Sequence, residues 1–177
     1  MTHSDLIALC SQWALKHKYS VAAITECKVK CTDEVPDILA FKASGQSTLF
    51  EIKVSHSDFK ADAGKPFRKK PDRGLGLYRY YVCPSSVIKP EELPEGWGLI
   101  WFRESDGKSF LLAPSNKFLK RDHLAESAIL VSSLRRVGKV IAKAGSVTGV
   151  SCKAYTIATQ GRTALYLEGE ELPLKPE

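Results

Sequence analysis

The segment from Thr48 to Val54 constrains the fold more than any other, because it carries two charges inside an apolar run. Its apolar and β-branched residues predict a β-strand, and side chains along a strand alternate between the two faces of a sheet. Glu51 and Lys53 are therefore expected on one face, and their apolar neighbours on the other, which is the expected core face. Charged side chains are rarely buried unless they are paired or used in function. The strand thus predicts a sheet protein with a candidate site at Glu51 and Lys53.

The remaining elements predict a mixed α/β fold. Ser4 is expected to cap a first helix, and Ser55 or Ser57 to cap a short helix that follows the charged strand. Five further strands are predicted at Tyr19–Val29, Val35–Phe41, Leu77–Cys83, Trp97–Arg103 and Ser109–Ala113. A long helix is expected from about Lys120, because apolar residues recur there at helical spacing. The order of helix, three strands, helix, further strands and helix predicts a central mixed β-sheet flanked by helices.

Turn signals and length set the domain organisation. The residues 43–46 predict a hairpin turn, and the Pro- and Gly-containing stretch from Lys65 to Gly76 predicts a loop or a partly helical excursion. A final hairpin is expected between 153–157 and 165–167, joined near Gln160 and Gly161. A chain of 177 residues suits one domain with a small appendage. We therefore expect a core domain over residues 1–144 and a C-terminal extension over residues 145–177.

Composition places the chain among cytoplasmic proteins. The hydrophobic fraction of 44% and the charged fraction of 26% are those of a globular domain. No apolar run approaches the ~20 residues that span a bilayer, so no membrane partner is expected. The N-terminus has no secretory pattern, and five scattered cysteines are expected to be reduced thiols in the cytoplasm.

Positive charge is concentrated in one segment. The net charge is +6, and the stretch from Lys60 to Arg73 holds six basic residues against two acidic ones. Phosphate-contacting candidates there are Lys65, Arg68, Lys69, Lys70 and Arg73. A smaller basic group includes Arg135 and Arg136. Clustered positive charge indicates either a polyanionic partner or a solvated basic surface, and composition alone leaves both open.

Asp37 is expected near Glu51 if the second and third strands form a hairpin. Two converging carboxylates repel each other unless a cation lies between them. Mg²⁺ prefers oxygen ligands and often uses one or two carboxylates together with water and phosphate oxygens. Such a cation would polarise a phosphate and lower the pKa of a bound water, while Lys53 would orient that water or offset developing charge.

Pro36-Asp37, a hairpin, and then Glu51-Ile52-Lys53 resemble the PD-(D/E)xK phosphodiesterase superfamily, which has the restriction-endonuclease-like fold. The stretch from Asp37 to Asp62 is similar to MmcB-like DNA-repair nucleases and to small bacteriophage and prophage proteins, and the likeness covers roughly residues 20–136. It implies an α/β restriction-endonuclease-like core. The MmcB-like proteins often have Arg-Ala before the aspartate, where this chain has Val35-Pro36, and no fourth motif is evident.

The resemblance implies a nuclease that uses Mg²⁺ or Mn²⁺. Asp37, Glu51 and Lys53 are then the expected catalytic residues, with Asp37, Glu51 and the main-chain carbonyl of Ile52 as metal ligands. DNA is the expected substrate, RNA is not excluded, and a homodimer is an expected assembly because many relatives cut two strands. The rival hypothesis is a non-cleaving nucleic-acid-binding, regulatory or inhibitory protein on the same fold.

Several other residues have both a functional and a structural interpretation. Glu26, expected in the first strand, is either a further metal ligand or a surface glutamate, and His56 either touches phosphate or is solvated. Asp58 and Asp62 share a helix face, which the helix dipole explains more simply than a site does. The tyrosines around Arg79 either stack on bases or pack in the core.

Overall fold

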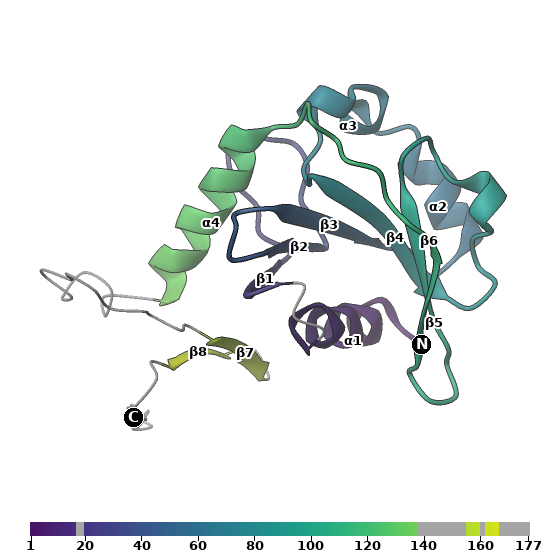
Figure 1. Ribbon diagram of the computed structural model, residues 1–177, viewed down its shortest axis with the longest axis horizontal. Coiled ribbons are helices and arrows are strands. Elements are labelled where there is room, and N and C mark those ends of the chain that lie inside the picture. The colour runs from purple at the N-terminus through teal and green to yellow at the C-terminus, as the bar shows by residue number, and fades with distance from the viewer. Residues whose placement is uncertain (17–19, 138–154, 160–161, 167–177) are drawn as a thin grey trace, which may run out of the picture.

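A six-stranded mixed sheet forms the centre of the computed structural model, which describes residues 1–16, 20–137, 155–159 and 162–166 (Figure 1). Its strands follow chain order: β1 (Ala22–Thr25), β2 (Ile38–Phe41), β3 (Ser47–Ile52), β4 (Tyr78–Pro84), β5 (Gly98–Phe102) and β6 (Ser109–Ala113). The central strands β3, β4 and β5 are parallel, and the other neighbours are antiparallel. The predicted mixed α/β fold is confirmed.

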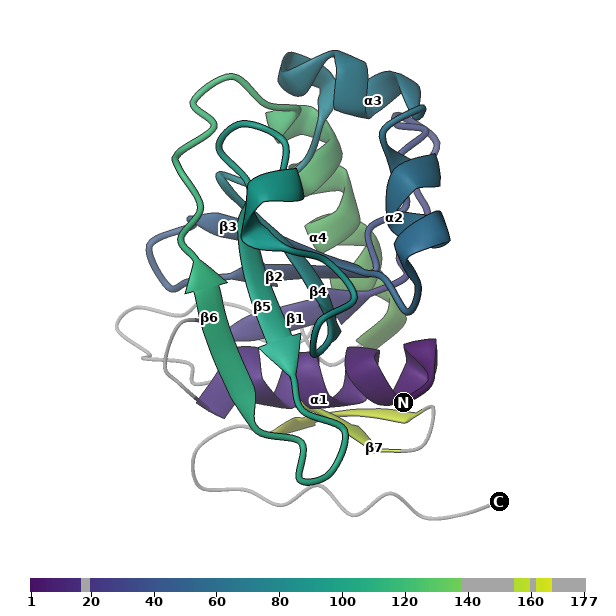
Figure 2. The same ribbon diagram turned by 90° about the vertical axis from the view of Figure 1, so that its right-hand side faces the viewer.

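Helices cover both faces of this sheet. They are α1 (His3–Lys16), α2 (His56–Asp62), α3 (Pro66–Lys69), the 3-10 turns η1 (Pro71–Arg73) and η2 (Pro90–Glu92), and α4 (His123–Val137). Leu6 and Cys10 of α1 pack on one face, whereas Phe59 of α2 and Ile129 of α4 pack on the other. Figures 1 and 2 show α1 on the side of the sheet away from α3. None of these described helices is long and apolar enough to cross a membrane.

Strand β3 is buried on both faces, because it lies between two helical layers. Phe50 and Ile52 pack against α1, as the alternation predicted for the core face. Leu49, on the opposite face, belongs to the core under α2 and α4. Central strands with parallel neighbours are normally covered on both sides. Glu51 therefore projects into a buried layer and not into solvent.

The first elements differ from prediction at their ends. Strand β1 ends at Thr25, because Glu26 has a positive φ of 47°, so Glu26 lies after the strand and not within it. Thr2, and not Ser4, caps α1: its Oγ1 accepts from Asp5 N at 3.2 Å, and its own N–H donates to Asp5 Oδ2 at 2.8 Å. The reciprocal pairing satisfies two N–H groups at the helix start. Ser55 caps α2 as predicted.

The predicted hairpin between β2 and β3 is confirmed. Lys42 N donates to Gln46 O at 2.9 Å, and Gly45 N donates to Lys42 O at 2.9 Å. Gly45 has a φ of +79°, which glycine adopts without a steric penalty. The turn fixes the antiparallel register in which Ile38 lies opposite Phe50.

The excursion between α2 and β4 is partly helical, as predicted, and contains α3 and η1. In the C-terminal extension, β7 (Tyr155–Thr159) and β8 (Arg162–Tyr166) form an antiparallel two-stranded sheet. This agrees with the expected pairing of the tail, with boundaries a few residues from those predicted. Gln160, Gly161 and the expected boundary at residue 144 lie outside the described residues.

Helix α4 turns away from the sheet several of the apolar residues that recur in it at helical spacing, among them Leu124 and Val131. Leu124 and Val131 are more than half exposed, whereas Ala125 and Ile129 are fully buried. Glu126 explains the difference, because its Oε1 accepts from Ser47 Oγ at 2.9 Å and from Gly76 N at 2.8 Å. These bonds fix the rotation of the helix at its first turn.

Candidate functional site

Asp37 and Glu51 converge where β2 begins and β3 ends. The antiparallel register continues from Ile38 and Phe50 to set Asp37 opposite Glu51. Asp37 Oδ2 accepts from Ile52 N at 2.7 Å, and Oδ1 lies 3.4 Å from His3 Nε2. Burial, together with the negative charge of Glu51, raises the pKa of Asp37 to about 6. The repulsion expected of two converging carboxylates is therefore present.

Lys53 lies on the same face as Glu51 and is only 3% exposed. Its Nζ is 3.3 Å from Glu51 Oε2 and 3.2 Å from Asp62 Oδ1. Burial alone would lower the pKa of Lys53, but Glu51 and Asp62 outweigh burial and raise it. Lys53 is accordingly a buried ammonium held between two carboxylates.

Arg68 enters the same buried layer from α3. Its Nη2 lies 3.0 Å from Glu51 Oε1, its Nε donates to Asp62 Oδ2 at 2.6 Å, and its Nη1 donates to Glu34 Oε1. The guanidinium also lies over the Trp97 ring, 4.7 Å from the centroid. Burial would lower the pKa of Arg68, but the three carboxylates raise it further than burial lowers it. We call Glu34, Asp37, Glu51 and Asp62 the acidic cluster.

The sequence analysis did not assign two members of the acidic cluster to the site: it did not consider Glu34, and it attributed Asp62 to the helix dipole. Glu34 is 1% exposed and accepts from Leu75 N at 2.7 Å, and burial raises its pKa. Nothing in its local sequence distinguishes it from a turn residue. Asp62 is also 1% exposed, and it accepts from Tyr81 OH at 2.7 Å. Its position three residues after the buried Phe59 was a usable signal, because such residues share a helix face.

The cations around Asp62 set its ionisation. Lys65 Nζ is 2.6 Å from Asp62 Oδ1, which adds a third cation to Arg68 and Lys53. Burial would raise the pKa of Asp62, but these cations hold it well below its usual range. Asp62 is therefore an ionised, buried anchor, and not only a residue that complements the helix dipole.

The other predicted site residues lie further out. The Glu26 side chain is exposed, although its N–H donates to Asp37 O at 3.2 Å. His56 pairs with Glu92 Oε1 at 2.7 Å, and this bond lowers the pKa of Glu92 to about 2. Tyr80 stacks on Phe50, which favours core packing for this tyrosine.

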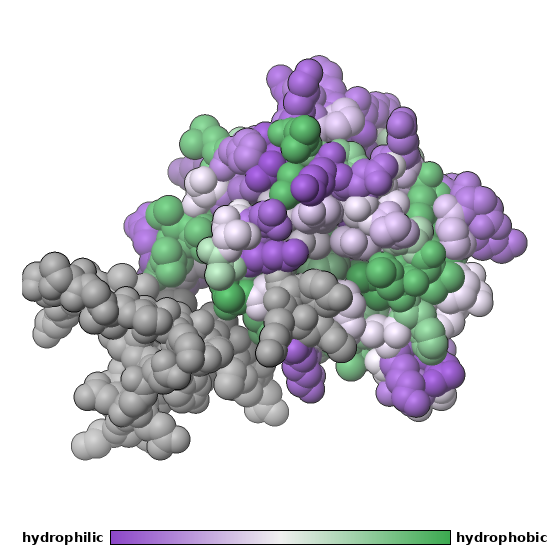
Figure 3. All heavy atoms as spheres, viewed as in Figure 1, coloured by the Kyte–Doolittle hydropathy of each residue, from purple (hydrophilic) through white to green (hydrophobic). Residues whose placement is uncertain are grey.

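The basic segment from Lys60 to Arg73 directs some of its charged side chains into solvent and others toward the acidic cluster. Lys69, Lys70 and Arg73 are exposed, and Figure 3 shows hydrophilic side chains gathered over the region of α3. The Arg68 side chain is only 5% exposed and faces the acidic cluster. Of the residues predicted to contact phosphate, Arg68 thus lies inside the site in this structure.

The donor atoms suit a hydrated hard cation better than a fully protein-enclosed one. Among the described residues, no three histidine, cysteine or acidic side chains are arranged to hold a metal ion. Asp37 and Glu51 offer a smaller oxygen set, which Mg²⁺ or Mn²⁺ would complete with water or phosphate. Arg68 and Lys53 pair with the two carboxylate oxygens of Glu51. A metal ion would therefore compete with these two side chains for Glu51.

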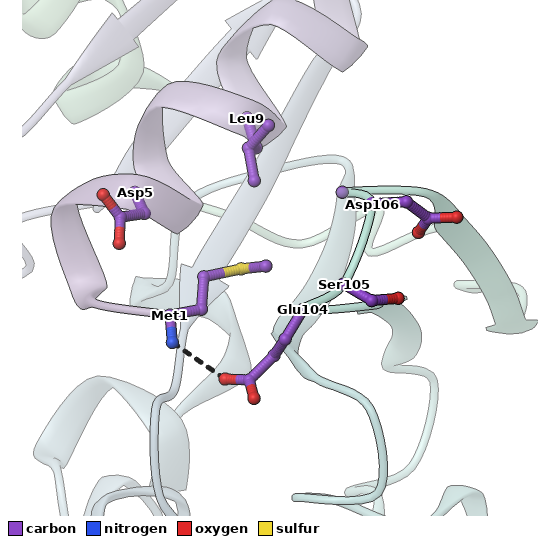
Figure 4. Close-up of a pocket in the computed structure, with 7 residues that line it drawn as sticks. Met1, Asp5, Leu9, Glu104, Ser105 and Asp106 are labelled. Carbon is purple, nitrogen blue, oxygen red and sulfur yellow. Dashed lines mark hydrogen bonds and ion pairs between the residues drawn. The ribbon is translucent and has the colours of Figure 1, made fainter.

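A surface hollow lies away from the acidic cluster and is lined by other residues. Figure 4 shows it between the start of α1 and the turn from β5 to β6, where Met1 N donates to Glu104 Oε1 at 2.8 Å. Asp5, Leu9 and Asp106 also line it. None of the acidic cluster lines this hollow, so the chemistry described above is not located there.

The raised pKa of Asp37 predicts a pH-dependent stability change in Asp37→Asn. Folding raises this pKa from 3.8 to about 6, so the ionised carboxylate destabilises the metal-free protein as pH rises from about 4 to above 6. The asparagine removes that penalty and can still accept from Ile52 N. We expect the variant to be more stable than the wild type above pH 6, by up to about 3 kcal/mol.

Urea unfolding in EDTA between pH 4 and pH 8 measures this difference. The stability gap should open as pH rises and close near pH 4. A gap that is constant with pH, or a variant that is less stable at pH 7, would show that the Asp37 carboxylate is not strained by burial and Glu51.

The comparisons with known proteins inform the fold. No family model matches the chain, and no curated protein matches it. A solved structure described as the SPO1766 protein of unknown function from Silicibacter pomeroyi has a TM-score of 0.58 and 15% sequence identity. The match covers 85% of this chain and 99% of that one. At this identity the likeness shows a shared fold.

Proposed function

We propose that this protein is a metal-dependent nuclease that hydrolyses DNA phosphodiester bonds, with a restriction-endonuclease-like core. The observation that carries the proposal is the convergence of Asp37 and Glu51 beside the buried Lys53. Two repelling carboxylates next to an ammonium reduce the stability of a folded core. Buried charges arranged in this way are typical of functional sites, and this supports a catalytic role. On this proposal the protein acts in the cytoplasm, in DNA repair or in a bacteriophage context, and a homodimer would cut both strands.

Each residue has a distinct part in the proposed reaction. Asp37, Glu51 and the Ile52 carbonyl would hold Mg²⁺ or Mn²⁺, which would supply Lewis-acid polarisation of the phosphate and a water of lowered pKa. Lys53 Nζ lies on the same face as these ligands, where it orients the attacking water or offsets charge on the phosphate oxygens. Asp62 positions that ammonium from 3.2 Å away. The low exposure of the layer strengthens these interactions.

The exposed basic residues supply a surface for the substrate. Lys69, Lys70 and Arg73 lie on the segment that carries Arg68 into the site. Phosphate contacts of this kind provide affinity without sequence preference. The surface suits DNA, and RNA carries the same phosphates.

A cleavage assay of the wild-type protein tests the proposed function. Plasmid and single-stranded DNA are incubated with the protein in Mg²⁺, in Mn²⁺ and in EDTA. Products that require metal, and that disappear in Asp37→Asn prepared identically, support a nuclease. Intact DNA under all conditions would favour the second candidate.

That second candidate is a non-cleaving nucleic-acid-binding or regulatory protein on the same fold. One observation favours it: both carboxylate oxygens of Glu51 pair with cations of the chain itself. A protein of this type would bind DNA equally well in EDTA and in Mg²⁺. Fluorescence anisotropy with a labelled duplex separates the two candidates when it is combined with the cleavage assay.

Neutralising the basic surface should weaken DNA binding and flatten its salt dependence. In Lys69→Gln/Lys70→Gln/Arg73→Gln, each lost phosphate contact should reduce the slope of log affinity against log salt by about 0.9. The effect should be similar across DNA sequences. Arg135→Gln/Arg136→Gln is the control. An unchanged slope in the triple variant, with a flattened slope in the control, would place the DNA along α4.

A further inference from the structure

Arg68 links α3 to three members of the acidic cluster, and Lys65, at the start of this helix, pairs with one of them. The described residues of α3 and η1 include none that is buried as a whole, and α3 has no side-chain cap at its start. The Arg68 guanidinium nevertheless reaches Glu34, Glu51 and Asp62. The segment is therefore linked to this site by charge, and little by apolar packing.

The contact with Glu51 is an ion pair without a well-aligned hydrogen bond. Arg68 Nη2 lies 3.0 Å from Glu51 Oε1, yet this buried nitrogen makes no hydrogen bond that satisfies the usual angles. Its bonds to Glu34 and Asp62 are, by contrast, aligned. Of its three carboxylate partners, Arg68 can therefore give up Glu51 without losing a hydrogen bond.

Charge in the layer is nearly balanced with Arg68 in place. The acidic cluster contributes four carboxylates, and the side chains of Lys53, Lys65 and Arg68 contribute three positive charges. Without the Arg68 charge, the layer has two more carboxylates than cations. That excess matches one divalent cation, and a positive charge beside Glu51 opposes such a cation by direct repulsion.

We propose that Arg68 is a built-in counter-cation that competes with the divalent metal for Glu51, so that metal binding loosens α3 from the acidic cluster. The inference rests on the proposed function, because it assumes a metal held by Asp37 and Glu51. Competition between two ligands for one group is reciprocal: metal weakens the docking of Arg68 by the factor by which Arg68 weakens metal binding. The metal state of the site is then sensed by the basic segment that carries Lys69 and Lys70.

Isothermal titration with Mn²⁺, in the absence of DNA, tests the competition directly. Arg68→Gln should bind Mn²⁺ at least about fivefold more tightly than the wild type, a factor typical of coupled sites. Lys60→Gln, on the neighbouring helix α2 and exposed, is the matched control and should leave the metal affinity unchanged. Arg68→Lys retains a positive charge and should show a smaller gain than Arg68→Gln. Combining Asp37→Asn with Arg68→Gln should remove the tight binding.

Hydrogen exchange of the wild-type protein provides a second measurement that needs no Arg68 variant. Mn²⁺ should increase amide exchange of residues 67–70 relative to EDTA, and it should not do so in Asp37→Asn. This arm decides the matter if Arg68→Gln fails to fold.

The outcomes separate the two proposals. If the wild type binds Mn²⁺ through Asp37 but Arg68→Gln binds no more tightly, the role of Arg68 is refuted and the metal site stands. Unchanged or slower exchange of residues 67–70 on metal binding would also refute it. If none of the variants binds Mn²⁺ in an Asp37-dependent way, the metal site of the proposed function fails and the competition fails with it.

Discussion

Asp37→Asn, Glu51→Gln and Lys53→Met are each expected to reduce metal-dependent DNA cleavage by roughly a thousandfold. Each substitution nearly preserves side-chain shape and removes one charge. On the proposed function, loss of either carboxylate would weaken the hold on the cation, and loss of the ammonium would remove the group that lies 3.3 Å from Glu51 Oε2. Because the three groups would act on the same phosphate and water in the proposed reaction, a double variant should cleave only slightly more slowly than the slower of its two single variants.

Single-turnover cleavage of a labelled duplex measures these effects. Circular dichroism and a urea midpoint must accompany each variant, because Glu51 and Lys53 are buried and paired. Glu95→Gln, an exposed acidic position, is the matched control and should cleave as the wild type does. Wild-type cleavage by any natively folded member of the three would remove that residue from the catalytic set.

Arg79→Met is expected to destabilise the protein by roughly 3–5 kcal/mol, because hydrogen bonds to a buried charged group are among the more costly to lose. Arg79 is 2% exposed and donates to three main-chain carbonyls, those of Gly76, Pro71 and Gly74, at 3.2, 2.8 and 3.1 Å. Its guanidinium lies 4.1 Å from the centroid of the Phe118 ring. Methionine fills much of the volume but leaves these carbonyls without their donor.

Urea unfolding at pH 7 provides the measurement for Arg79→Met. Arg73→Met changes an exposed arginine of η1, next to the carbonyls that Arg79 bonds, and should alter stability by less than about 0.5 kcal/mol. The loop that Arg79 holds also presents Leu75 N to Glu34 Oε2. Arg79→Met should therefore also weaken the hydrogen bond from Leu75 N that holds Glu34 in the acidic cluster. Equal stabilities of the two variants would mean that water replaces the lost donor.

The strand that carries Glu51, with Lys53 directly after its end, could be predicted because its information is local. Alternation along β3 assigns each residue to a face, and the turn at Gly45 sets the register that brings Asp37 to Glu51. The cap at Ser55 is local too. None of these inferences needs the position of a distant segment.

The partners of the site could not be predicted in this way. Arg68 belongs to a run of basic residues, and no local periodicity indicates that it alone turns inward while Lys69 remains exposed. Glu34 lies in the loop between β1 and β2, and its buried carboxylate accepts from Leu75 N, forty-one positions away. The rotation of α4 likewise depends on Glu126 reaching Ser47, seventy-nine positions away. Long-range contacts decided each of these cases.

The wide sequence separation within the acidic cluster has a consequence for folding kinetics. Arg68 meets Glu34 across thirty-four positions, and it meets Glu51 only after the chain has crossed from β3 through α2 and α3. Non-local pairings of this kind, and the parallel pairing of β3 with β4, require costly loop closure and tend to form late. Substitutions of Glu34, Glu51 or Asp62 should thus accelerate unfolding and leave the refolding rate nearly unchanged. These charges then slow the unfolding of the native protein and have little effect on how fast it folds.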